Sequence, residues 1–391
     1  MFNFQKSSGS LLKRLQAAGA FKMPVTADAG DPLDETVAFG DNPGQLRMFS
    51  YMPGRVAAPA LVVVLHGCGQ TAASYNHGAG WSTLAERYGF ALLMPEQQRS
   101  NNPNGCFNWF QREDATRGRG EAASIRQMVE AMIRDKGCDP RQVFVTGLSA
   151  GGAMTSVMLA CYPETFAAGA IIAGLPYGAA STVKQAFQSM FQCPPRPATE
   201  WGDLVRAAAP RQDGPWPRVS VWHGNADKTV IPSNAREIVK QWTNVHRLAD
   251  APSKQDVVDS YPRQVWLGES GEELVESYTI TDMAHGTPLA TGNAESECGI
   301  PGPYLLEVGI SSSFHIAKFF GVTRNGARPR KENAKTSTRP APLSVQRELT
   351  DFGAPEAAMR EEARVKSTGS HLDIGAVITA ALTKAGLMPR G

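Results

Sequence analysis

Short apolar runs alternate with longer amphipathic stretches between about residue 45 and residue 320. Most of the runs are almost continuously apolar, which is typical of strands covered on both faces of a sheet. On this pattern we predict strands at 46–51, 60–65, 91–95, 142–146, 168–173, 219–222 and 274–281.

The stretches between these runs repeat apolar residues every three or four positions, the spacing of a helix that buries one face. Residues 121–135 show this spacing most clearly. We predict helices at 82–88, 121–135, 151–162, 234–243 and 313–319. Strands that alternate with helices predict an α/β fold with a mostly parallel central sheet and helices on both faces.

The composition changes after residue 321. Residues 324–347 consist mainly of Arg, Lys, Pro, Ser, Thr and Asn, with almost nothing to bury. Residues 373–387 regain amphipathic spacing. The expected organisation is an amino-terminal extension at 1–44, an α/β domain at 45–321, a basic and Pro-rich linker at 322–372, and a short amphipathic segment at 373–391.

Charge and hydropathy exclude several classes of protein. The 39 Lys and Arg residues against 37 Asp and Glu residues give a net charge of +2, which predicts no nucleic-acid partner. A second interpretation of the basic segment, as an arm for nucleic acid or a polymer granule, is weaker than a solvated linker. No apolar run approaches the roughly 18 to 20 residues of a membrane span.

The first 23 residues lack the continuous apolar core of a secretory signal, so a cytoplasmic location stays open. The sequence does not indicate an oligomeric state. Its six cysteines form no CxxC motif and no Cys/His pairing at metal-ligand spacing, which predicts no metal site. The Gly-Cys-Gly at 67–69 lacks the Gly-Lys-Ser/Thr that completes a phosphate loop, so no nucleotide is expected.

The strongest motif is Gly-Leu-Ser-Ala-Gly at residues 147–151, directly after the apolar run 143–145 and directly before a helix-length run. This context favours a nucleophile elbow over an ordinary glycine-rich turn, because a strained strand-to-helix turn holds the serine hydroxyl clear of the backbone. Ser149 is the candidate nucleophile. The N–H of Ala150, at the amino terminus of the helix, is a candidate oxyanion donor.

A serine nucleophile needs a histidine base, and in this fold the chain order is Ser, acid, His. His285 lies in a Gly- and Pro-containing loop after the predicted strand 274–281. His223 precedes the best acid, so its position in the chain order is wrong. We therefore predict His285 as the base.

The acid is expected just after the preceding strand, where Asp227 follows the run 219–222. A surface aspartate in an Asn/Asp/Gly turn is the alternative interpretation of this residue. Asp213 precedes the strand and Asp282 lies three residues before His285, so both fit less well. We predict Asp227 as the acid.

A second oxyanion donor in such sites comes from the loop after an early central strand. Here Leu-His-Gly-Cys-Gly-Gln at residues 65–70 follows the apolar run 61–64. The backbone N–H of Cys68 is the candidate donor, and the flanking glycines permit close approach of a substrate. His66 is interpreted as a buried hydrogen-bonding residue and not as a second base.

These motifs resemble the poly(3-hydroxybutyrate) depolymerase family of serine esterases, in the α/β-hydrolase superfamily, over about residues 45 to 321. The resemblance is carried by residues 65–70, 106–110, 147–151, 222–227, 283–286 and 302–321. It implies hydrolysis of polyester or other carboxylic ester bonds by an extracellular catalytic domain, with Ser149, Asp227 and His285 as the triad and no cofactor.

The resemblance also implies that Cys68 pairs with Cys106 as a disulfide, for which two free buried thiols are the alternative. Trp109 either lines the acyl or alcohol pocket or is an ordinary core tryptophan. For Trp222, at the end of a predicted strand, we expect a core position.

The leading functional hypothesis is a serine esterase that cleaves poly(3-hydroxybutyrate)-type polyester or its oligomers through an acyl-enzyme. Within the same fold, a feruloyl or acetyl esterase acting on plant polysaccharide and a peptidase differ only in their pocket walls. The alternative from another class is a scaffold that binds polymer or granules without catalysis. A missing triad member would favour the scaffold, and none is missing.

Overall fold

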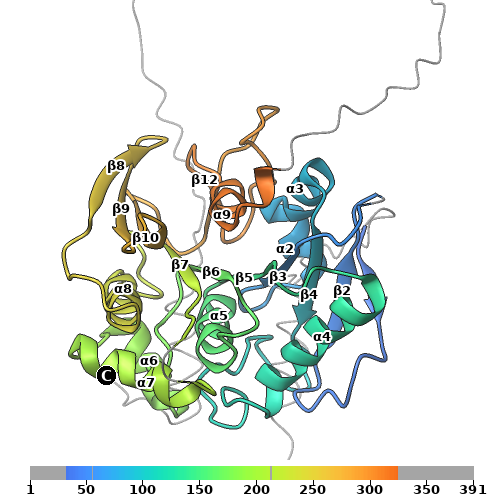
Figure 1. Ribbon diagram of the computed structural model, residues 1–391, viewed down its shortest axis with the longest axis horizontal. Coiled ribbons are helices and arrows are strands. Elements are labelled where there is room, and N and C mark those ends of the chain that lie inside the picture. Colours follow the sequence, from blue (N-terminus) through green and yellow to red (C-terminus); the bar gives the residue numbers. More distant parts are fainter. Residues whose placement is uncertain (1–31, 55, 212–213, 325–391) are drawn as a thin grey trace, which may run out of the picture.

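The computed structural model describes residues 32–54, 56–211 and 214–324 (Figure 1). Its main feature is a ten-stranded sheet in the order β1-β2-β4-β3-β5-β6-β7-β10-β9-β8. The strands are β1 (Asp34–Thr36), β2 (Arg47–Tyr51), β3 (Leu61–Leu65), β4 (Ala91–Glu96), β5 (Val143–Leu148), β6 (Ala168–Ile172), β7 (Arg218–Gly224), β8 (Lys254–Val258), β9 (Tyr261–Leu267) and β10 (Glu273–Ile280).

The six central strands, from β4 to β10 in the sheet order, are all parallel to one another. The outer strands β1 and β2 on one side, and β9 and β8 on the other, pair antiparallel. Parallel neighbours all end at the same edge of a sheet, so β3, β5, β7 and β10 deliver the loops that follow them to one edge. The predicted α/β fold with a mostly parallel sheet is confirmed.

Helices cover both faces of the sheet (Figure 1). Strand β3 shows why, because Leu61, Val63 and Leu65 belong to one apolar core and Val62 and Val64 to another. The first core lies under α4 (Gly120–Lys136), α5 (Ala150–Cys161), α6 (Val183–Phe191), α7 (Ala198–Ala208) and α8 (Ser233–Val245). The second lies under α2 (Ala72–Ala79), α3 (Trp81–Tyr88) and α9 (Ser312–Phe320), which precedes a 3₁₀ turn at Val322–Arg324.

The predicted strands and helices are all present, with small shifts at their ends. The sheet begins earlier than residue 45, because β1 pairs with β2. The prediction did not include β1, β8, β9, α2, α6, α7 or the small parallel sheet of β11 (Thr287–Leu289) and β12 (Leu305–Glu307). The linker and the amphipathic segment predicted after residue 321 lie almost wholly outside the described residues and stay predictions.

Within the described residues, no helix is long and apolar enough to cross a membrane. The same part of the chain contains no group of three or more His, Cys, Asp or Glu residues that could hold a metal ion.

Candidate active site

Ser149 occupies a strained turn between β5 and α5, with φ 57° and ψ −116°. A positive φ is costly for a residue with a side chain and persists only where the surroundings impose it. A Cβ on Gly147 would lie 2.5 Å from the carbonyl carbon of Gly151, and a Cβ on Gly151 would lie 2.3 Å from the backbone oxygen of Leu65. The two glycines of the motif therefore allow α5 to start directly against β3 and force the turn at Ser149.

Asp227 and His285 are in direct contact. Nδ1 of His285 lies 2.7 Å from Oδ2 of Asp227, and both side chains are buried. The other carboxylate oxygen, Oδ1, accepts hydrogen bonds from the backbone N–H groups of Thr229 (2.8 Å) and Val230 (2.9 Å). These bonds fix the carboxylate so that Oδ2 faces the imidazole. Nδ1 of His285 then carries the proton that it donates, which leaves Nε2 as the basic nitrogen.

Burial by itself would raise the pKa of Asp227. Hydrogen bonds from His223 and His285 outweigh that effect and hold the pKa well below its usual range. The carboxylate therefore stays ionised beside His285 at neutral pH.

Ser149, Asp227 and His285 follow β5, β7 and β10, so all three lie at the carboxyl edge of the central strands. Among the described residues, Ser149 Oγ makes no hydrogen bond to either of the other two. Such bonds are often long in proteins without a bound substrate. Of the rejected acids, Asp282 is exposed, and Asp213 lies outside the described residues.

His223, which the expected chain order excluded as the base, also lies beside Asp227. Its Nε2 donates to the backbone oxygen of Val230 (2.7 Å) and lies 3.3 Å from Oδ2 of Asp227. Because a carbonyl oxygen only accepts, Nε2 carries the proton, and Nδ1 is buried without a partner among the described residues. His223 is thus a second donor to the Asp227 carboxylate. The sequence signal that could have indicated this contact is the spacing of four residues between His223 and Asp227.

We call residues 65–70 the oxyanion loop. Its Gly67 N–H donates to Oε1 of Gln70 (2.8 Å), and its Gly69 N–H donates to the backbone oxygen of Asn104 (2.9 Å). The Cys68 N–H between them has no acceptor in the described part of the chain. Ala150 is the first residue of α5, where an N–H has no acceptor within the helix. Neither candidate oxyanion donor therefore has a hydrogen-bond acceptor among the described residues.

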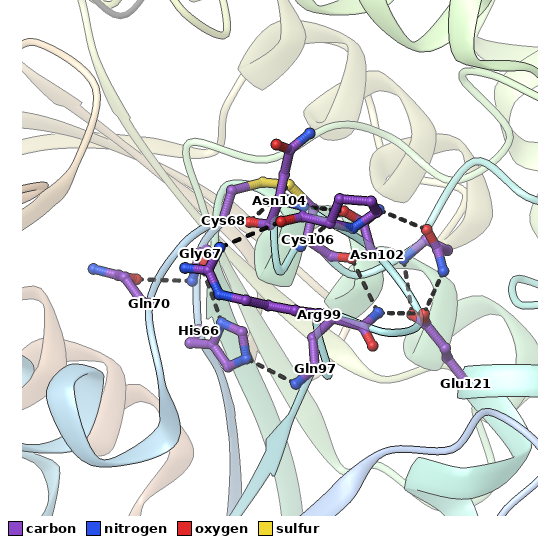
Figure 2. The surroundings of a disulfide bond; sticks show 12 residues. His66, Gly67, Cys68, Gln70, Gln97, Arg99, Asn102, Asn104, Cys106 and Glu121 are labelled. Carbon is purple, nitrogen blue, oxygen red and sulfur yellow. Dashed lines mark hydrogen bonds between the residues drawn. A yellow bond between two sulfur atoms is a disulfide. The ribbon is translucent and has the colours of Figure 1, made fainter. Parts of the chain in front are cut away.

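Cys68 and Cys106 form a disulfide with an S–S distance of 2.12 Å (Figure 2). It ties the oxyanion loop to the segment that follows β4, here called the Cys106 loop (residues 97–110). The cysteines of the described residues that remain free are Cys138, Cys161, Cys193 and Cys298, all buried. Burial raises the pKa of the Cys161 thiol to about 11, so this thiol is unreactive.

The two tryptophans have core positions. Trp109 is only 8% exposed and packs edge-on against Phe110 in the first core, which favours its interpretation as a core residue over a pocket wall. Trp222 is fully buried and stacks on Tyr278 with ring centroids 3.7 Å apart. Trp222 thus packs β7 against β10, the two strands that precede Asp227 and His285.

Comparison with known proteins identifies relatives over most of the chain. The family model described as "Esterase PHB depolymerase" matches residues 48–260. Poly(3-hydroxyalkanoate) depolymerase C of Paucimonas lemoignei is 45% identical over 313 residues, which cover 80% of this chain and 75% of the relative. Acetylxylan esterase of Coprinopsis cinerea is 36% identical over 66% of this chain and 69% of its own length.

Among solved structures, an acetyl xylan esterase from Aspergillus awamori superposes with a TM-score of 0.62 at 28% identity, covering 74% of this chain and 99% of that protein. The matches confirm the resemblance seen in the motifs and the α/β-hydrolase type of the fold. This chain belongs to the esterase PHB depolymerase family.

Proposed function

We propose that this protein hydrolyses carboxylic esters with Ser149 as nucleophile, His285 as general base and Asp227 as the acid that orients His285. The observation that carries the proposal is the 2.7 Å contact between His285 Nδ1 and Asp227 Oδ2, at the sheet edge where the elbow presents Ser149. An imidazole held in this way has its basic nitrogen free for the serine proton.

In the proposed reaction, His285 Nε2 takes the proton of Ser149 Oγ as that oxygen attacks the ester carbonyl. The Cys68 and Ala150 N–H groups donate to the oxygen that becomes negatively charged. His285 then gives its proton to the departing alcohol, which leaves an acyl group on Ser149. A water molecule then gives a proton to His285 while its oxygen attacks the acyl carbon. As the bond from that carbon to Ser149 Oγ breaks, His285 returns the proton to Oγ, which releases the acid and restores the enzyme.

The test is Ser149→Ala, assayed on short p-nitrophenyl esters. Loss of the nucleophile in a comparable triad costs on the order of 10⁶ in turnover, so activity should fall to background while circular dichroism stays unchanged. A folded Ser149→Ala protein with near wild-type activity would contradict the triad.

The favoured substrate is poly(3-hydroxybutyrate)-type polyester or its oligomers. The depolymerase relative, at 45% identity, covers more of this chain than the acetylxylan esterase at 36% or feruloyl esterase B of Neurospora crassa at 35%. Those two relatives make acetyl or feruloyl esters of polysaccharide the second candidate. A panel of hydroxybutyrate oligomers, amorphous polymer, acetylated xylan, a feruloyl ester and a peptide separates these classes.

We further propose that the catalytic domain works outside the cell. The Cys68–Cys106 disulfide supports this location, because disulfides persist in oxidising compartments and are rare in the cytosol. Mass spectrometry of natively prepared protein tests it: a bond between these two residues is expected, and free thiols in a fully active protein would contradict it.

A further inference from the structure

We propose that Glu121 and Gln97 are positioning residues that hold the oxyanion loop in the geometry needed for catalysis, in parallel with the disulfide. The inference rests on the proposed role of the Cys68 N–H as an oxyanion donor. It concerns a network of hydrogen bonds, centred on a buried carboxyl group, that links α4, the Cys106 loop and the oxyanion loop (Figure 2).

Glu121 is a fully buried carboxyl group in the first turn of α4. It accepts hydrogen bonds from the backbone N–H of Asn108 (2.8 Å), from the side-chain amide of Asn108 (2.8 Å) and from that of Gln97 (2.5 Å). No cation pairs with it among the described residues. Burial, with the nearby Asp114, raises its pKa to about 8. A buried carboxyl without a cation is costly, yet here it gathers three donors from two segments.

Gln97 follows β4 and connects both sides of the disulfide. Its backbone N–H donates to Nε2 of His66 (3.1 Å), and its side-chain amide donates to the backbone oxygen of Cys106 (3.0 Å) as well as to Glu121. Since His66 Nε2 accepts this bond, its proton is on Nδ1, which donates to the backbone oxygen of Gly67 (2.8 Å). Burial lowers the pKa of His66 to about 4, so the ring stays neutral and keeps this arrangement.

A second path reaches the other side of Cys68. The Gly69 N–H donates to the backbone oxygen of Asn104, whose own N–H donates to Oδ1 of Asn102 (3.0 Å). The side-chain amide of Asn102 donates to Oδ1 of Asn108 (2.8 Å), and Asn108 donates to Glu121. Gly67 and Gly69, the residues on either side of Cys68, are therefore both connected to Glu121 without the sulfur atoms.

The position of the Cys68 N–H is thus determined by two ties, one covalent and one polar. An oxyanion donor acts mainly in the transition state, because the negative charge develops there. If the network loosens, the N–H moves out of reach of the oxyanion while contacts to the rest of the substrate persist. The effect should therefore appear in kcat and hardly in KM.

The experiment is Glu121→Gln in the full chain, assayed above pH 8, where the Glu121 carboxylate is ionised and accepts at both oxygens. Glutamine keeps the shape but turns one of these acceptors into a donor that faces N–H groups. We expect kcat to fall about tenfold, a fraction of the loss on removing a whole donor, with KM changed less than about twofold. The matched control is Glu276→Gln, an equally buried carboxyl on β10 that binds Ser220 and Arg263. It should keep the wild-type kcat.

Asn102→Asp is the second variant, at a half-buried position that tolerates substitution better. It keeps Oδ1 but loses the donor to Asn108, so kcat should fall in the same way even if Glu121→Gln does not fold. Wild-type kcat in every variant that folds, or an equal loss in Glu276→Gln, would overturn the proposal. If Ser149→Ala is inactive while these variants are fully active, only this inference fails. If Ser149→Ala is active, the proposed function itself fails.

Discussion

His285 Nδ1 and Asp227 Oδ2 lie 2.7 Å apart although the residues are separated by 58 positions in the sequence. The contact is possible because β7 and β10 are adjacent parallel strands whose loops leave at the same edge. The two loops also touch through their backbones, where the Ala226 N–H donates to the backbone oxygen of Met283 (3.1 Å). The geometry of the proposed acid and base therefore depends on this pair of loops as a unit.

Asp227→Asn should lower kcat by about 10⁴ while substrate binding changes little, because an amide at this position favours the wrong imidazole tautomer. Steady-state kinetics on a p-nitrophenyl ester measures kcat and KM of this variant. Asp282→Asn is the control, since Asp282 is exposed and its positive φ of 58° suits asparagine. A large loss of kcat in Asp282→Asn, together with a wild-type kcat in Asp227→Asn, would show that Asp282 and not Asp227 is the acid.

Gly224→Ala should separate the two loops. A Cβ there would lie 2.1 Å from the backbone oxygen of Met283, so the β10 loop that carries His285 must move. We expect kcat to fall by at least about tenfold and the free energy of unfolding to fall by about 1 to 3 kcal/mol, as for other overpacked sites. The same change at Gly54, where a Cβ would meet nothing within 4 Å, should affect neither quantity. Unchanged kinetics for Gly224→Ala would show that the loop contact is dispensable.

Cys106→Ser removes the covalent tie and leaves the polar network in place. The expected result is a fall in kcat of about tenfold with little change in KM, because the donor is a backbone amide and not the sulfur. In the double variant Cys106→Ser, Glu121→Gln, kcat should fall by more than the product of the two single effects. The reason is that neither the disulfide nor the intact network then holds the oxyanion loop. A fall in kcat equal to the product of the two single effects would mean that the disulfide and the network act independently.

The stability of the protein should depend on pH through Glu276. Burial raises its pKa from 4.5 to about 7, despite the hydrogen bond from Ser220 and the charge of Arg263. A carboxyl whose pKa is raised on folding contributes stability below its unfolded pKa, and that contribution is lost as the pH rises through the folded pKa.

Wild type should therefore lose stability relative to Glu276→Gln between pH 4.5 and 7, by about 3 kcal/mol for a shift of this size. Urea unfolding at several pH values measures the difference. Glu269→Gln, at an exposed position, should track the wild type throughout. A constant difference between wild type and Glu276→Gln would contradict the raised pKa.

The central sheet and the residues of the candidate triad could be predicted from the amino-acid sequence alone. Strands such as β3 and β5 are buried on both faces, so their continuous apolar runs are visible without knowledge of their neighbours. The elbow at Ser149 is likewise local, because its two glycines and the flanking strand and helix lie within one short segment. Asp227 and His285 were found because each follows a predicted strand in the required order.

The outer strands and the polar contacts could be identified only once the fold was known. Strands β8 and β9 are partly exposed and mix polar with apolar residues, so their pairing partners and not their hydrophobicity define them. The donors to Glu121 come from residues 13 and 24 positions away in the sequence. His223, near the end of β7, lies 3.3 Å from Asp227 because the chain turns between the two residues. A buried polar group must find a partner, but which one it finds depends on the segments that packing brings beside it.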